Sequence, residues 1–308
     1  MAQKATTPSF VVELRLQSSP SDERKLNVAF EAGRMLYNAC IQESLKRLAL
    51  MRQSKSYQRA RLLPKGADRT AAFKSLREQF GFKDSAIQSY AVKTKNACHI
   101  GDHLDVHTVQ KVASRAFEAT AKYAIGKKGR PRFKQPGWLN SLESKTNASG
   151  IRYRDGSVVW GDLSMLAIID PNDEVVRYGL AHKIKYCRVV RRLIRGEQKY
   201  YVQLIVEGPP YHKPKNTIGT DLVGLDLGPS TIAYIGNTTA GLERFCDELQ
   251  CKQRTIRKLQ RQMDRSRRAT NPDNYRPDGT VKKGARKWRK SGRYGALQSE
   301  VAELQRAQ

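Results

Sequence analysis

The stretch VGLDLGPSTIAYIGN, residues 223–237, predicts a strand, a tight turn and a second strand. Side chains alternate between the two faces of a strand, so the apolar residues of the first strand share one face and Asp226 lies on the other. Gly224 and Gly228 have no side chains to crowd the Asp226 carboxylate. Asp226 is therefore a candidate metal or phosphate ligand, and the alternative is an aspartate that makes turn hydrogen bonds at a strand end.

Two families of proteins use this local pattern. In the actin, sugar-kinase and heat-shock ATPases, a similar strand–turn–strand holds ATP phosphates near the start of a long chain. In RuvC-type, RNase H-like nucleases, the aspartate is the first of several acids that bind two metal ions. Here 222 residues precede Val223 and 80 follow Gly228, and the chain is strongly basic, so both observations favour the nuclease pattern.

The charge of the chain indicates a polyanionic partner. The 308 residues include 57 Lys and Arg and 29 Asp and Glu, which gives a net charge of +28. Residues 1–125, 126–220 and 221–308 carry net charges of +10, +10 and +8, so the excess is not confined to a tail. Such a protein usually binds nucleic acid or an acidic membrane. A ribosomal or general RNA-binding protein has the same composition and stays an alternative.

A second segment, KKGRPRFK at residues 127–134, follows a predicted helix and has five cations in eight residues. Pro131 favours an extended backbone, and Phe133 offers an aromatic face. Cations of this kind neutralise phosphates, and the ring stacks on a base or a sugar, or packs on the protein core. The candidate nucleic-acid-binding residues here are Lys127, Lys128, Arg130, Arg132, Phe133 and Lys134. The alternative, which is compatible with nucleic-acid binding, is a solvated basic loop that Phe133 anchors to a barrel.

Two further basic segments lie near the carboxyl end. A helix over 252–268 has a core face and many arginines, and the segment 282–293 surrounds Trp288 with cations. The candidate nucleic-acid-binding residues are Arg254, Arg257, Lys258, Arg261, Arg265, Arg268, Lys287, Trp288 and Arg289. A solvated amphipathic helix and a disordered loop are the alternatives.

The rest of the chain predicts an α+β protein. Alternating apolar residues indicate a strand over 8–17, and a 3.6-residue period indicates helices over 22–50, 67–96 (two, divided near Gly81) and 105–125. Short strands are expected at 151–154, 157–160 and 166–169, a hairpin at 183–195 and 199–207, and helices at 242–268 and 294–308. The five scattered cysteines favour a reducing compartment, and no apolar run is long enough for a membrane span. We expect a cytoplasmic, nucleoid-associated protein.

With these segments in view, the chain resembles the TnpB family, the transposon-encoded (OrfB) RNA-guided DNA endonucleases related to type V CRISPR effectors. Four features match in order: the amino-terminal strand and a helix carrying Arg34-Met-Leu-Tyr37-Asn38, the basic unit ending in Gly129–Lys134, the β-rich stretch closing with Tyr200–Glu207, and Gly224–Gly228 with its following basic helix. The resemblance spans essentially the whole chain.

The resemblance implies an α+β multidomain fold: a β-barrel wedge domain with an inserted helical recognition bundle, followed by the start of a RuvC-like α/β domain. The implied boundaries are 1–20 plus 126–220 for the wedge, 21–125 for the recognition domain and 221–308 for the incomplete nuclease domain. Asp226 matches the first catalytic acid, a Mg²⁺ ligand. The implied partners are a guide RNA, which supplies recognition by base pairing, and a target DNA; the oligomeric state stays open.

The later catalytic acids of the family and its zinc-binding CxxC pairs are not found in this sequence. We therefore expect a chain truncated in the RuvC domain that does not cleave DNA by itself, with zinc only in the missing part. The alternative is a nuclease-dead, RNA-guided DNA-binding protein, a decayed transposase or a repressor. Cys246 and Cys251, and the series His99, His103 and His107, are weak metal-site candidates because no second cysteine pair exists and Gly101 interrupts the helical period.

Overall fold

The computed structural model describes residues 7–213, 221–228, 230–244, 252–284 and 286–307. The chain forms two compact units, Met1–Lys213 and Pro214–Gln308. In the described part of the chain, every helix is too short or too polar to cross a bilayer. The division into wedge, recognition and nuclease domains stays a prediction.

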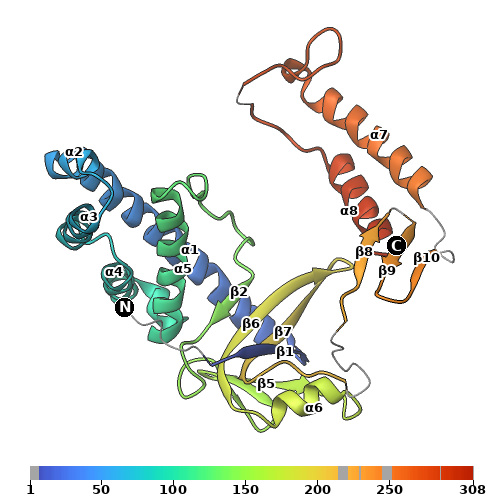
Figure 1. Cartoon of the computed structure of the whole chain (residues 1–308), viewed down its shortest axis with the longest axis horizontal. Helices are drawn as coiled ribbons and strands as arrows, with labels where there is room; N and C mark the ends of the chain where they lie inside the picture. The colour runs from blue at the N-terminus through green and yellow to red at the C-terminus, as the bar shows by residue number, and fades with distance from the viewer. Residues whose placement is uncertain (1–6, 214–220, 229, 245–251, 285, 308) are drawn as a thin grey trace. The chain divides into compact units, whose positions relative to one another are not determined.

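The first unit contains a seven-stranded antiparallel sheet in the order β2-β6-β7-β1-β5-β4-β3 (Figure 1). The amino-terminal strand β1 lies between β7 and β5, so residues far apart in sequence meet in one sheet. The sheet curls, but no ladder joins β2 to β3 among the described residues, and it is not a closed barrel. Its strands are β1 (Ser9–Leu16), β2 (Ser141–Glu143), β3 (Arg152–Arg154), β4 (Ser157–Trp160), β5 (Leu163–Ile168), β6 (Ile184–Ile194) and β7 (Glu197–Glu207).

The strand predictions for this unit are largely confirmed. The predicted face of β1 is buried at each of its apolar positions. The long hairpin β6–β7 turns at Arg195 and Gly196, whose φ values of 52° and 80° suit a two-residue left-handed turn. The strand expected over 166–169 instead spans Leu163–Ile168, because it pairs along the full length of β4. The three-residue strand β2 is too short to show an alternating pattern and was not predicted.

The segment between β1 and β2 is helical, as the sequence predicts. Its elements are α1 (Pro20–Gln53), α2 (Lys55–Leu62), α3 (Ala67–Gln79), α4 (Asp84–Ala97), the short η1 (His99–Asp102) and α5 (Val106–Ala124). Ser19 and Asp22 form a capping box that fixes the start of α1. Asp105 accepts hydrogen bonds from the first amides of α5. Two short helices were missed, α2 and α6 (Glu174–Leu180), because each has too few turns for a clear period.

Helices α1, α4, α5 and α6 share one core with the sheet, and a second cluster joins α2 and α3 to the end of α1. Helix α1 lies beside α5 and crosses toward β2 (Figure 1). At the crossing, a Cβ on Gly33 would come within 2.8 Å of Leu142 and 2.9 Å of Leu139, so the absence of a side chain permits the close approach. This packing fixes the segment before β2 against α1, and that segment carries the first basic strip.

The second unit contains the three-stranded antiparallel sheet β10-β9-β8, formed by β8 (Gly224–Leu227), β9 (Thr231–Ile235) and β10 (Ala240–Arg244). The predicted strand–turn–strand is confirmed. The helix expected over 242–268 is wrong at its start, because residues 240–244 pair with β9 as an edge strand. Helix α7 (Gln253–Thr270) begins later and packs on α8 (Gly292–Arg306) through a small apolar cluster. The turn-rich segment between these helices contains the short η2 (Pro272–Asn274).

Candidate nucleic-acid interface

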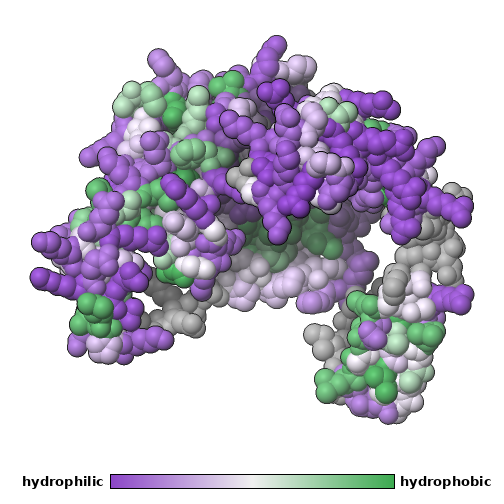
Figure 2. All heavy atoms as spheres, turned by 90° about the horizontal axis from the view of Figure 1, so that it is seen from above, coloured by the Kyte–Doolittle hydropathy of each residue, from purple (hydrophilic) through white to green (hydrophobic). Residues whose placement is uncertain are grey.

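The first basic strip, residues 127–134, forms neither helix nor strand and is open to solvent. Four of its cations are exposed, and Lys134 is half-buried. Phe133 is 56 % exposed, so the alternative in which its ring anchors the strip in the protein core is wrong. Figure 2 shows hydrophilic side chains over most of the face seen there. The strip thus presents cations and a free aromatic face together; the exposed cations are Lys127, Lys128, Arg130 and Arg132.

The backbone of this exposed strip is held by α1. The Asn38 side-chain amide donates to the Lys134 carbonyl at 2.9 Å and accepts from the Lys134 amide at 2.8 Å. Arg34 donates to the same carbonyl at 2.9 Å. An asparagine amide offers the donor and acceptor that a neighbouring strand would offer. These bonds attach the strip to α1 at its last residue, and we call this arrangement the Asn38 clamp.

Two more arginines fix the segment that leads from the strip into β2. Arg191 of β6 donates to the carbonyls of Gly137 at 3.2 Å and Leu139 at 3.3 Å. Arg115 of α5 donates to the Ser141 carbonyl at 2.7 Å. Burial lowers the pKa of the Arg115 guanidinium, which Glu143 partly offsets. Charged donors on backbone carbonyls are among the stronger hydrogen bonds, so residues 134–141 form a fixed base for the strip.

Lys134 links the strip to the aromatic surface of α1. Its ammonium lies 5.3 Å from the centre of the Tyr37 ring and 3.5 Å from the Trp138 carbonyl oxygen. Burial lowers the pKa of Lys134, and the nearby charge of Arg115 acts in the same direction. Burial also raises the pKa of Tyr37. The Lys134 ammonium thus already interacts with groups of the protein, in contrast to the exposed cations of the strip.

The second basic surface is the outer face of α7. Ile256 and Leu259 are buried against Leu297 and Val301 of α8, so the opposite face of α7 points to solvent. The predicted nucleic-acid-binding residues of this helix are all exposed, namely Arg254, Arg257, Lys258, Arg261, Arg265 and Arg268. An amphipathic helix that exposes a row of arginines suits a run of phosphates.

The third basic surface, residues 286–290, repeats the clamp seen at the first strip. The buried Asn271 accepts from the Arg289 amide at 2.7 Å and donates to the Arg289 carbonyl at 2.9 Å. Trp288 lies beneath the Arg267 guanidinium, 3.8 Å from its ring centre, and its edge meets Tyr275. Arg267 and Tyr275 therefore already contact the Trp288 ring, while the Lys287 and Arg289 side chains are exposed.

Asp226 lies on β8, opposite Ala233 of β9, with its carboxylate on an exposed strand. Directly paired residues of antiparallel strands share a face. By this register Ala233 and Leu242 share the face of Asp226, whereas Glu243 pairs with Ile232 and lies on the other face. Glu243 was expected on a helix and is on strand β10, yet it still does not join Asp226.

The described residues do not fit a two-metal nuclease site. Mg²⁺ requires several oxygen ligands, and two ions need more than one carboxylate. Asp226 has space around it, but no group of three His, Cys, Asp or Glu side chains suited to a metal occurs within the described ranges.

The weaker metal-site candidates also find no support in the described residues. His99 lies in η1, His103 follows it, and His107 lies in α5, so the three do not share one helix face. The ring of His99 contacts Asp102 at 3.3 Å. Cys246 and Cys251 lie outside the described residues.

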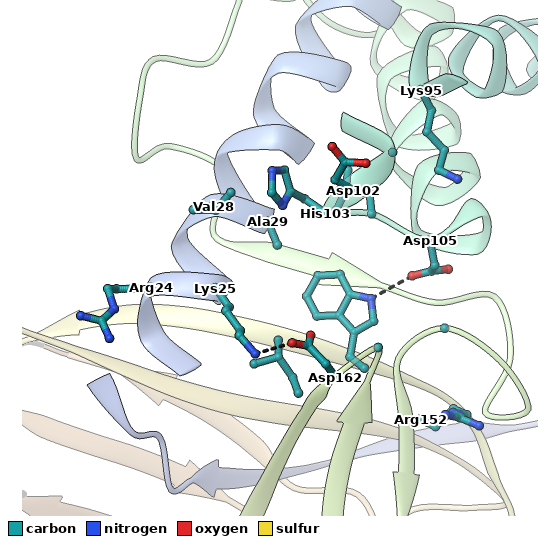
Figure 3. Close-up of a pocket in the computed structure, with 16 residues that line it drawn as sticks. Arg24, Lys25, Val28, Ala29, Lys95, Asp102, His103, Asp105, Arg152 and Asp162 are labelled. Carbon is teal, nitrogen blue, oxygen red and sulfur yellow. Dashed lines mark hydrogen bonds and ion pairs between the residues drawn. The ribbon is translucent and has the colours of Figure 1, made fainter. Parts of the chain in front are cut away.

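A cavity of about 640 Å³ opens between α1, the start of α5 and the turn between β4 and β5 (Figure 3). Its acids already have partners. Asp105 accepts from the Trp160 indole at 2.9 Å and caps α5, and Asp162 forms an ion pair with Lys25. Because these carboxylates serve the fold, the basic surfaces are the stronger candidate for function.

Sequence reasoning missed the residues that hold these surfaces in place. Asn38 was noted as part of a motif, but Asn271 and Arg191 were not singled out. Asn38 contacts a backbone 96 residues away and Arg191 one 54 residues away, so local patterns carry no signal for them.

The solved structures that are similar to this chain include two Cas12f complexes. The chain is 11 % identical to a protein in a Cas12f1–sgRNA–target DNA complex, with a TM-score of 0.38 over 97 % of this chain and 76 % of that chain. It is 12 % identical to a protein in a CRISPR-Cas12f ternary complex, with a TM-score of 0.30 over 96 % of this chain and 75 % of that chain. No protein-family model and no curated protein matches the chain.

Proposed function

We propose that this chain is an RNA-guided DNA-binding protein of the TnpB kind, in which the basic strip 127–134 contacts the guide RNA. The observation that carries the proposal is the Asn38 clamp, which anchors the solvent-facing cationic strip to α1 at Lys134. A preformed site loses less conformational entropy on binding than a flexible tail. The exposed face of α7 and the clamped segment 286–290 supply further cations for the RNA or the target DNA.

Asp226 is proposed as the first acid of a RuvC-type nuclease site. Its place on a strand between two glycines supports the assignment. Because its described neighbours add no second carboxylate on the same face, we expect the 308-residue chain alone not to cleave DNA in the presence of Mg²⁺. Robust Mg²⁺-dependent cleavage that Asp226→Ala abolishes would contradict this expectation.

The deciding experiment is to purify the 308-residue chain from cells that also carry its flanking DNA, and to sequence the RNA that copurifies. We expect one discrete RNA encoded beside the gene. The RNA-loaded protein should then retain DNA that contains a complement to that RNA and release a scrambled DNA of equal length. A random sample of cellular RNA would instead favour a general RNA-binding protein.

The strip itself is tested by salt dependence. For single strands, the slope of log affinity against log salt falls by roughly 0.7 for each phosphate contact that is lost. The double variant Lys127→Ala and Arg130→Ala should therefore flatten the slope by about 1.4. Lys46→Ala with Lys93→Ala, which removes two cations of α1 and α4 outside the strip, is the matched control. Equal slopes for both variants would remove the strip from the interface.

A further inference from the structure

Trp138 is an exposed tryptophan on an otherwise fixed backbone. Its side chain is 63 % exposed, whereas Trp160 is 6 % exposed and Trp288, at 37 %, already lies against an arginine and a tyrosine. Tryptophan contributes a large apolar surface and is rarely left free in this way unless a partner covers it.

The surroundings of Trp138 hold its backbone in place. The Trp138 amide donates to the Gln135 carbonyl at 3.0 Å in a turn. Arg191 binds the carbonyls on both sides of Trp138, those of Gly137 and Leu139. The Leu139 side chain is fully buried against α1 at the Gly33 crossing. The exposed ring therefore sits on an ordered base, and a partner would not have to order that base on binding.

Trp138 is also joined to the cationic strip. The Lys134 ammonium lies 3.5 Å from the Trp138 carbonyl, so the turn brings Trp138 back beside Lys134. Phe133, which is also an exposed aromatic residue, directly precedes Lys134. Two free rings thus flank one clamped lysine, and the cations of the strip continue on the Phe133 side. Cations interleaved with exposed aromatic rings are the arrangement that binds single-stranded nucleic acid, because each ring stacks on a base while the cations meet phosphates.

We propose that Trp138 and Phe133 form a stacking platform for unpaired bases of the RNA at the strip. This inference rests on the proposed function and adds that the RNA is single-stranded here. Bases inside a duplex have both faces covered by their neighbours, so a ring reaches them only where the strand is open. The cations beside the platform favour a polyanion over an apolar protein segment as its occupant.

The test compares Trp138→Ala with wild type for binding of a 12-nucleotide single-stranded oligoadenylate and of an RNA duplex of equal length. Loss of one stacked base weakens affinity by roughly 5- to 150-fold. We expect a loss in this range for the single strand and less than a twofold change for the duplex. Trp138→Phe should keep most of the affinity. Leu193→Ala, which shortens an exposed apolar side chain at the β6–β7 turn, should change neither.

The outcomes separate this inference from the proposed function. If the double strip variant weakens binding but Trp138→Ala leaves the single-strand affinity unchanged, the platform is overturned and the RNA-binding proposal survives. If Trp138→Ala weakens single strand and duplex equally, stacking is overturned. If the wild-type protein binds neither of these RNAs and copurifies with no discrete RNA encoded beside its gene, the proposed function itself fails. Quenching of tryptophan fluorescence by the single strand in Trp288→Phe protein, and its loss in Trp288→Phe with Trp138→Ala, gives an independent readout.

Discussion

Removal of the Asn38 side chain tests whether the basic strip is a preformed surface. Asn38→Ala deletes both hydrogen bonds of the clamp, at 2.8 and 2.9 Å, and leaves the Lys134 amide without its acceptor. Arg34 still binds the Lys134 carbonyl, so the strip loses part of its attachment and the fold of α1 is kept. The perturbation is therefore local.

The magnitude follows from the two lost hydrogen bonds. Each contributes about 1 kcal/mol in a partly buried setting, so opening of the strip becomes easier by about 2 kcal/mol. A change of 1.4 kcal/mol is a factor of ten in an equilibrium constant, so the open population rises roughly 30-fold. RNA affinity falls by at most the same factor, because the RNA must then order the strip itself.

Hydrogen exchange followed by mass spectrometry measures this opening directly. In Asn38→Ala, the Lys134 amide, followed in peptides that cover 130–138, should exchange about 30-fold faster, while peptides from β6 and β7 keep their wild-type rates. Gln42→Ala removes an exposed amide one turn along the same helix and serves as the control. Unchanged protection of 130–138 in Asn38→Ala would refute the view that the clamp orders the strip.

Three further predictions concern the fold that supports this surface. The Glu143 side chain is 8 % exposed, and its carboxylate forms an ion pair with Arg188 at 2.6 Å. Burial raises the pKa of Glu143. The hydrogen bond from Arg188 and the charge of Lys111 outweigh burial and hold this pKa below the usual 4.5. Glu143→Gln should therefore lower the free energy of unfolding by about 3 kcal/mol at pH 7 in urea titrations. The stabilising charge is present above the unfolded pKa and is lost as the pH falls through the folded one, so the difference from wild type should shrink below about pH 4. Gly179→Ala should destabilise the first unit by about 1–2 kcal/mol in thermal melts, since the new Cβ would overlap a methyl group of Val12 and the gain in helix propensity is smaller. Among the described cysteines, Cys98 should be alkylated first in peptide mapping with iodoacetamide, because it is exposed, whereas burial raises the pKa of Cys40 and of Cys187 to about 12; equal labelling of all three in folded protein would contradict the fold.

The regular elements could be read from the sequence because their signals are local. The alternation along β1, the long period of α1 and the Arg195-Gly196 turn each fix one element without distant contacts. The error at residues 242–244 arose because an edge strand of five residues carries no period that competes with the neighbouring helix. These residues form a strand because they pair with β9, and the sequence around them does not indicate this pairing.

The residues of the candidate site likewise include some that could be predicted from the sequence and some that could not. The exposed cations were predictable since charge is a property of composition, and the structure leaves them in solvent. The importance of Trp138 was not predictable. In the sequence, Trp138 could equally be a core residue or a surface residue. The structure decides this, because its neighbour Leu139 is buried in the core and Trp138 is left exposed.

The recurrence of the asparagine clamp explains how so basic a chain can present its charge in a fixed form. Like charges in a free loop repel one another and disfavour any single conformation. A neighbouring strand would order such a loop, but it would pair along its whole length and draw it into a sheet. One asparagine amide gives the same donor and acceptor at a single residue, and it does so at Lys134 through Asn38 and at Arg289 through Asn271. Each clamp therefore offsets the repulsion at one point and leaves the flanking cations free for phosphate. For this reason we expect the loss of either clamp to affect RNA binding more than the loss of any single exposed cation beside it.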